Sequence, residues 1–77
     1  MPPPPLIVDA RGLRCPLPVL RLARALRMHP ETTQFKLLSD DRATPSELVA
    51  WCAATGHTLA DDLQIIRNKF ANATGSH

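Results

Sequence analysis

Two segments with helical periodicity alternate with short strand-like runs, and this alternation constrains the fold more than any other feature of the chain. In each segment, the residues of one face recur at i, i+3, i+4 and i+7, the spacing of a buried helical stripe. These residues are Val19, Leu22, Ala23 and Leu26 in the first segment and Leu48, Trp51, Cys52 and Thr55 in the second. We therefore expect two helices that each bury one side.

Prolines mark both ends of the first helix. We expect it to begin near Cys15–Pro18, because proline suits the first helical turn, where its missing N–H costs nothing. It should run to about Met28, since His29-Pro30 cannot continue a helix.

The second helix has both a start and a stop signal. Thr44 is expected as its N-cap, with Pro45 at the first helical position and Glu47 completing a capping box. The helix should run to about Thr55, and Gly56 then supplies the C-cap.

Four short apolar or β-branched runs predict strands. They are Leu6–Asp9, Gln34–Ser39, His57–Ala60 and Leu63–Lys69, with a tight turn at Asp61-Asp62 between the last two. The order β-α-β-α-β-β predicts an α/β two-layer sandwich, in which a mixed four-stranded sheet carries two helices on one face.

A chain of 77 residues has room for one domain with one core. We expect this domain to span residues 6–70, after a disordered proline leader at 1–5 and before a flexible tail at 71–77. No apolar run reaches the ~20 residues of a membrane span, and the first residues lack the basic and apolar regions of a secretory signal. We expect a cytoplasmic protein whose two cysteines begin as free thiols.

Cys15 is the strongest candidate for chemistry, because it stands at a helix start in the segment Cys15-Pro16-Leu17-Pro18. The thiolate is the reactive form of cysteine, and the positive end of a helix lowers the pKa of a thiol beside it. Arg11 and Arg14 could lower the pKa further, and the loop before Cys15 would keep the sulfur near the surface. The opposing interpretation is an inert buried thiol, since free cysteine is often buried.

Cys52 shares a helical face with Leu48 and Trp51, which favours a packed core thiol. The alternative is a resolving cysteine that forms a reversible disulfide with Cys15. That disulfide would require their Cα atoms to lie within ~7 Å.

The sequence offers little support for other kinds of site. The three histidines (His29, His57 and His77) are scattered, so no spacing resembles a zinc site, and we expect no metal or organic cofactor. The three glycines form no phosphate-binding loop. Asp40-Asp41 is interpreted as a turn before the second helix rather than as a pair of catalytic carboxylates.

Basic residues gather in the first half of the chain. Residues 1–36 carry six basic and two acidic side chains, a net charge of +4, whereas residues 37–77 carry a net charge of −2. Arg21, Arg24 and Arg27 lie off the apolar face of the first helix, as a solvated face would. With Arg14, they could also attract an acidic partner, a sulfur oxyanion or a phosphate. The low net charge and the missing aromatic platform count against direct binding of nucleic acid.

The run Asp9-Ala10-Arg11-Gly12-Leu13-Arg14-Cys15-Pro16-Leu17-Pro18 resembles the signature of the TusA (SirA-like) sulfur-carrier family. The resemblance continues through Asp40-Asp41, Ala43-Thr44 and Cys52, and covers the chain from about Leu6 to Lys69. Three departures from the family pattern concern the choice of partner more than the chemistry. They are Arg42 in place of a frequent proline, Glu47-Leu48-Val49 in place of Asp-Ile-Pro, and a short final hairpin.

The resemblance implies the same sandwich fold and a persulfide on Cys15, framed by Gly12, Pro16 and Pro18. It implies a sulfurtransferase that acts as a carrier without a cofactor. The donor would be a cysteine desulfurase or a rhodanese-like protein, and an acceptor protein would serve tRNA thiolation, cofactor assembly or sulfur oxidation. Arg11, Arg14, Arg21 and Arg24 are candidates for supporting charge or for partner docking, and we expect a monomer.

Two other functions remain open at this stage. One is a regulatory or adaptor module that binds a partner protein without chemistry, in which case binding would survive loss of the Cys15 thiol. The other is a redox switch between Cys15 and Cys52, which would appear as a disulfide under mild oxidation.

Overall fold

The computed structural model describes residues 4–68 of the chain. Most of the predicted leader at 1–5, the last residues of the predicted domain at 6–70 and the whole predicted tail at 71–77 lie outside the described residues.

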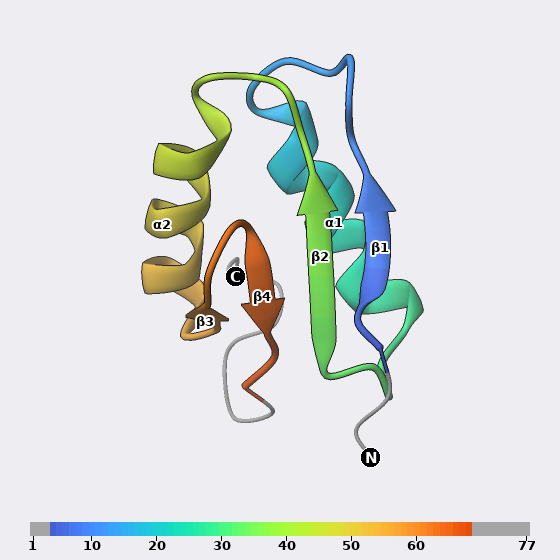
Figure 1. Cartoon of the computed structure of the whole chain (residues 1–77). Helices are drawn as coiled ribbons and strands as arrows, with labels where there is room; N and C mark the ends of the chain where they lie inside the picture. The colour runs from blue at the N-terminus through green and yellow to red at the C-terminus, as the bar shows by residue number, and fades with distance from the viewer. Residues whose placement is uncertain (1–3, 69–77) are drawn as a thin grey trace.

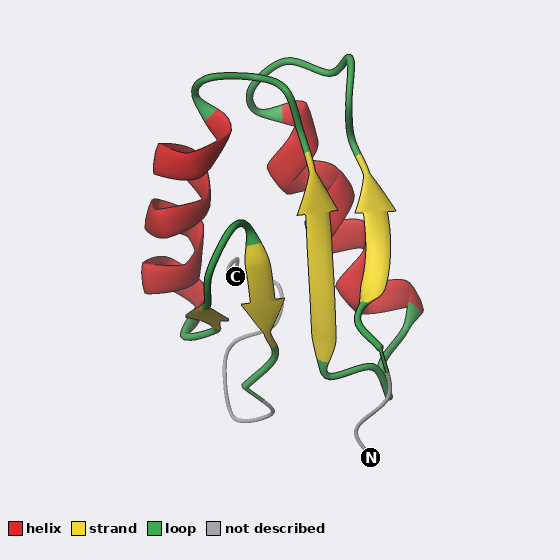
Figure 2. Cartoon of the chain, viewed as in Figure 1, coloured by secondary structure: helices red, strands yellow, loops and turns green. Residues whose placement is uncertain are grey.

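The structure is an α/β two-layer sandwich with the predicted β-α-β-α-β-β order (Figures 1 and 2). The elements are β1 (Leu6–Asp9), α1 (Leu17–Met28), β2 (Gln34–Leu38), α2 (Thr44–Thr55), β3 (Thr58–Leu59) and β4 (Gln64–Ile66). The four strands form one sheet in the order β1-β2-β4-β3. The pair β1–β2 is parallel and the other two pairs are antiparallel, so the sheet is mixed as predicted.

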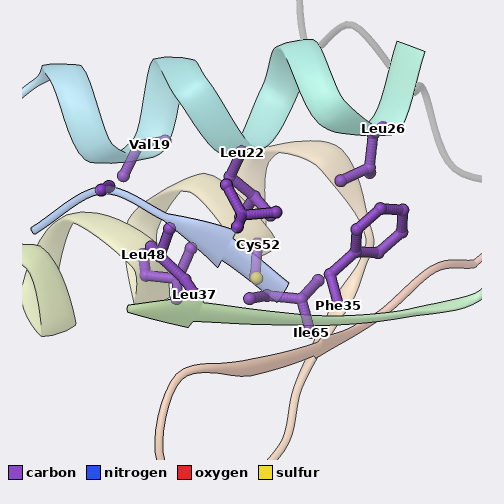
Figure 3. Packing of buried hydrophobic residues seen from close by; sticks show 10 residues of the cluster. Val19, Leu22, Leu26, Phe35, Leu37, Leu48, Cys52 and Ile65 are labelled. Carbon is purple, nitrogen blue, oxygen red and sulfur yellow. The ribbon is translucent and has the colours of Figure 1, made fainter. Parts of the chain in front are cut away.

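The core lies between the sheet and the two helices, and it is almost entirely aliphatic (Figure 3). Strand alternation turns Val8, Phe35, Leu37 and Ile65 toward the helices. The predicted face of α1 is buried throughout, with Val19, Leu22, Ala23 and Leu26. Of the predicted face of α2, Leu48, Cys52 and Thr55 are buried, whereas Trp51 is half-buried and packs against the core. Each fully buried large side chain contributes about 1.5–3 kcal/mol through its removal from water.

The predicted capping box at the start of α2 is wrong. Ala43 occupies the N-cap position and makes no side-chain cap, while Thr44 is already helical. Thr44 is buried, and its hydroxyl is hydrogen-bonded to the Ser39 hydroxyl at 2.8 Å rather than to the helix backbone. The other end of α2 is as predicted: Gly56 has a φ of 88°, and its N–H donates to the Cys52 carbonyl at 2.8 Å.

The last two strands are shorter than predicted, and the turn between them is longer. The Ala60 N–H donates to the Gln64 carbonyl at 2.7 Å, which makes Asp61 to Leu63 a three-residue turn instead of two. Asp62 and Leu63 both have positive φ, 53° and 61°, so the chain leaves the extended conformation before Gln64. Lys36 of β2 holds this turn by an ion pair with Asp62 at 2.8 Å.

Arg67 joins the end of the last strand to the end of α1. Its Nη2 donates to the carbonyls of Leu26 and His29 at 2.7 and 2.8 Å. Its Nε donates to the carbonyl of Thr32 at 2.8 Å. Leu26 belongs to the last turn of α1, where carbonyls have no partner inside the helix, so Arg67 acts as a cap from a distant part of the chain.

Within residues 4–68, neither helix combines the length and the apolar character needed to cross a membrane.

Candidate functional site

Cys15 lies in the loop between β1 and α1, two residues before the helix begins. It is half-buried, so its sulfur is not sealed within the core. The Cys15-Pro16 peptide bond is cis. Pro16 is exposed at the N-cap of α1, whereas Pro18, in the first turn, is buried. The prediction that Cys15 stands at the start of the first helix is therefore confirmed to within two residues.

Two carboxylates from the loop after β2 hold the Cys15 loop in place. Asp40 accepts a hydrogen bond from the Gly12 N–H at 3.0 Å. Asp41 accepts a short hydrogen bond from the Cys15 N–H itself. Gly12 has a φ of 85°, a conformation that glycine adopts at low cost, and this turns the loop toward the carboxylates.

This role of Asp40 and Asp41 was not predicted. The pair was interpreted as a turn before the second helix, which is only part of what they do. The β-α-β order gave a partial signal, because it allows β1 and β2 to be parallel neighbours, and the loops that follow such strands meet at the same edge of the sheet. The structure has this pairing, so the loop after β2 lies beside the loop that carries Cys15.

Asp41 also organises the start of α2. Its Oδ1 accepts the Ala43 N–H at 3.1 Å, and its own N–H donates to the Ser39 hydroxyl at 3.2 Å. The hydrogen bonds from Cys15 and Ala43, together with the charge of Arg14, lower the pKa of Asp41 below 3.8. One ionised carboxylate thus connects the candidate nucleophile to the second helix.

The expectation of a lowered thiol pKa at Cys15 is wrong. Partial burial raises the pKa above 9.0, and the charge and hydrogen bonding of Glu47 and the charge of Asp41 raise it further. The prediction was based on Arg11, Arg14 and the helix end, which are close to Cys15 in the chain. Folding instead brings two carboxylates toward the sulfur, that of Asp41 from the loop after β2 and that of Glu47 from α2.

The predicted arginines fall into different surroundings. Arg11 forms an ion pair with Asp9 at 2.9 Å and lowers the pKa of that carboxyl to about 2. Arg21 donates to the Asp9 carbonyl at 3.2 Å. Arg14 lines a cavity of about 400 Å³ beside the Cys15 loop, together with Gly12, Asp40, Asp41 and others. Arg24 is exposed and lines a separate groove between β1 and α1. Of these four, Arg14 is the one that lines a cavity together with Asp40 and Asp41.

Cys52 is buried in the core, which confirms the prediction of a packed thiol (Figure 3). Only 5% of it is exposed, and burial raises its pKa. Both cysteines are free thiols.

The described part of the chain contains no group of three or more histidine, cysteine, aspartate or glutamate side chains that could hold a metal ion. His57 is buried against Trp51 and accepts a hydrogen bond from the Asn68 N–H through Nδ1.

Comparison with known proteins gives a consistent result. The family model described as "Sulfurtransferase TusA" matches residues 6–64. The "Putative sulfur carrier protein NMA0882" of Neisseria meningitidis serogroup A is 39% identical over 54 residues, which cover 70% of this chain and 73% of the relative. A serogroup B counterpart, NMB0681, matches to the same extent. The "Putative sulfur carrier protein YrkI" of Bacillus subtilis is 29% identical over 55 residues, covering 71% of this chain and 73% of the relative. No solved structure matches the chain.

Proposed function

Because this chain belongs to the sulfurtransferase TusA family, we propose that it carries sulfane sulfur as a persulfide on Cys15 and passes it to a partner protein. The sulfur-carrier names of its relatives support this proposal. Membership of the family shows a role in sulfur transfer in general. The proposal adds that the sulfur is held as a persulfide, that Cys15 holds it, and that partner proteins supply and accept it.

The observation that carries the proposal is the bracing of the Cys15 loop. The backbone N–H of Cys15 is bound to Asp41, while its side chain is only half-buried. Gly12 is bound to Asp40 three residues earlier. A carrier needs a thiol that a partner can reach in a defined position, and this arrangement provides both. Gly12, Pro16 and Pro18 form the frame of the loop.

The transfer needs only the Cys15 sulfur and the two partners. The Cys15 thiolate attacks the outer sulfur of a donor persulfide, a new S–S bond forms, and the donor leaves as a thiolate. Cys15 then holds the outer sulfur as Cys15–S–SH. A thiolate of the acceptor attacks that same sulfur, and Cys15 leaves as a thiolate. The transferred sulfur keeps its oxidation state throughout, so no external oxidant or reductant enters.

The electrostatics of the site affect the first step. Only the thiolate attacks, and the raised pKa of Cys15 keeps most of the resting carrier in the thiol form near neutral pH. The rate of loading should therefore rise as the pH increases through the neutral range.

The partners follow from the chemistry. The donor must present a sulfane sulfur, as a cysteine desulfurase or a rhodanese-like protein does, and the acceptor must present a thiolate. We propose that the chain acts as a monomer, because one half-buried thiol on one loop held in position is sufficient for both steps.

Intact-protein mass spectrometry tests the proposal directly. The wild type, Cys15→Ser and Cys52→Ser would be incubated with thiosulfate, with polysulfide, and with a cysteine desulfurase and cysteine. We expect the wild type and Cys52→Ser to gain the mass of one sulfur atom, lost again on reduction, and Cys15→Ser to gain none. Loading of Cys15→Ser would refute the assignment of the site.

The same experiment separates the two other functions. A folded, reduced wild type that gains no sulfur from any donor would indicate an adaptor module instead. A loss of two hydrogen masses under mild oxidant, absent in both cysteine variants, would indicate a Cys15–Cys52 disulfide. That disulfide would have to draw Cys52 out of the core where it is packed.

A further inference from the structure

The free edge of β1 and the groove beside it form an interaction surface that the sulfur chemistry does not use. We infer that this surface binds an extended segment of a partner protein, which adds to β1 as a strand and carries carboxylates in alternation with apolar side chains. The inference does not depend on a persulfide at Cys15.

β1 lies at one edge of the sheet. It is the first strand of the order β1-β2-β4-β3, so β2 is its only neighbour within residues 4–68 (Figure 1). The Ala10 N–H donates to the Leu38 carbonyl of β2 at 2.7 Å. In a parallel ladder the backbone groups of every second residue face the neighbouring strand, so those of Val8 face β2 and those of Ile7 face outward from the edge. The Asp9 carbonyl at this edge is bound by Arg21, whereas the N–H and carbonyl of Ile7 can pair with an added strand.

A groove lies between this edge and α1. It has a volume of about 310 Å³, and its lining includes Ile7, Val8, Arg21, Arg24 and Met28. Ile7 and Met28 are 54% and 63% exposed, which is high for large apolar side chains. Because successive side chains of a strand alternate, Ile7 lies on the open face of the sheet, opposite the buried Val8. An added strand would place one set of side chains beside Ile7 and the other set beside α1.

Charge selects the occupant of the groove. Arg21 and Arg24 line the side of the groove formed by α1, and neither forms an ion pair within residues 4–68. Arg21 donates one hydrogen bond to the Asp9 carbonyl at this edge, so its charge stays beside β1 without a carboxylate partner. Side chains of an added strand that point toward α1 would meet two guanidinium groups, which favours carboxylates. Side chains on the other face would meet Ile7, which favours apolar residues. A second copy of this chain would bring its own Arg21 and Arg24 to the same place, and like charges would oppose that pairing.

The groove also leads toward Cys15. Arg21 and Arg24 line a second hollow of about 230 Å³ together with Leu13, Leu17 and Leu20. Leu17 is two residues beyond Cys15, and 48% of it is exposed. A partner bound along β1 would thus continue over the start of α1, close to the candidate nucleophile. The surface fits a partner that must dock and then present a thiol.

Fluorescence anisotropy with three labelled peptides tests the inference. The probe is a peptide of about six residues, the usual length of a strand, with alternating Glu and Val. A second peptide has Lys in place of Glu, and a third keeps the Glu and Val side chains but carries an N-methyl group on every amide. We expect only the first to bind, because the second reverses the charge and the third cannot pair with a strand edge.

Two matched variants locate the binding on the protein. Arg24→Gln removes a charge from the groove, whereas Arg27→Gln removes one from an exposed position on the same helix that does not line the groove. We expect Arg24→Gln to weaken binding about fivefold, the scale of one exposed ion pair, and Arg27→Gln to leave it nearly unchanged. Both variants should stay folded, since both side chains are exposed. Arg27→Gln should lower the melting temperature by only a few degrees, because it loses the attraction between a cation and the helix end.

Measurement on the Cys15→Ser variant separates this inference from the proposed function. Binding of the Glu–Val peptide to that variant supports the docking surface whether or not sulfur is loaded. Equal binding of the N-methylated peptide, equal loss in both arginine variants, or dimer formation by the chain alone would each overturn the inference.

Discussion

Replacing Arg67 with methionine is expected to lower the free energy of unfolding by about 2–3 kcal/mol. The guanidinium donates to three carbonyls, those of Leu26, His29 and Thr32, at 2.7–2.8 Å. Hydrogen bonds with a charged donor are worth about 1.5–3 kcal/mol each when the partner is left unsatisfied. The full sum is not reached, because water can replace the bond to His29, which is exposed, and because burying the guanidinium has its own cost. That cost is visible in the lowered pKa of Arg67.

Methionine is a suitable replacement, because it keeps an unbranched apolar stem over Phe35 while removing all five donors. Thermal denaturation followed by circular dichroism measures the effect. For a domain of this size, 1 kcal/mol corresponds to about 4–8 °C, so a fall in Tm of about 8–24 °C is expected. Arg67→Lys should recover part of the loss, since an ammonium can bind one or two of the three carbonyls.

Arg27→Met is the matched control. Arg27 also lies in the last turn of α1, but it is exposed, and it shares only the general attraction between a cation and the helix end. That attraction is worth about 0.3–1 kcal/mol. If Arg67→Met melted within a few degrees of Arg27→Met, the reasoning about specific carbonyl contacts would be refuted.

Three further predictions concern the site. Glu47→Gln should lower the thiol pKa of Cys15, and the rate of iodoacetamide alkylation measured against pH should then rise at lower pH than in the wild type. Gly12→Ala should destabilise the fold by about 1–2 kcal/mol, as measured by urea denaturation, because a φ of 85° is strained for alanine. The new Cβ would cause no clash, since no atom lies within 4 Å of it. Folding lowers the pKa of Asp9 to about 2 and also lowers the pKa of Asp41. The stability that these two carboxylates provide is therefore complete at a pH above their pKa in the unfolded chain, and it is lost as the pH falls toward 2. Acid titration of the wild type and Asp41→Asn, followed by circular dichroism, should therefore show a smaller loss of stability with acid in the variant.

The fold could be predicted because its signals are local. The inward faces of both helices, the stop at His29 and the cap at Gly56 each depend on residues within one or two turns. The errors were also local in origin. Thr44 has the residue type of an N-cap, but the Ser39 hydroxyl competes for its side chain and leaves the cap to Ala43. At the final turn, the sequence did not indicate that Leu63 would adopt a positive φ.

The candidate site could be predicted only in part, because its support comes from distant residues. Cys15 was found from the motif that contains it, and Gly12 from its position in the same loop. The bonds that hold them to Asp40 and Asp41 span 28 and 26 residues. Such contacts depend on β1 and β2 being parallel neighbours, which the element order allowed but did not require.

The two carboxylates that raise the thiol pKa differ in what else they do, and this decides which variant tests the electrostatics. Asp41 holds the Cys15 backbone and the start of α2, so Asp41→Asn changes the position of the loop and the charge together. Glu47 is exposed on α2, and its effect on the thiol is by charge and by hydrogen bonding to the side chain. Faster alkylation in Glu47→Gln with an unchanged melting temperature would therefore isolate the effect on the thiolate. Faster alkylation in Asp41→Asn alone would instead indicate a loosened loop.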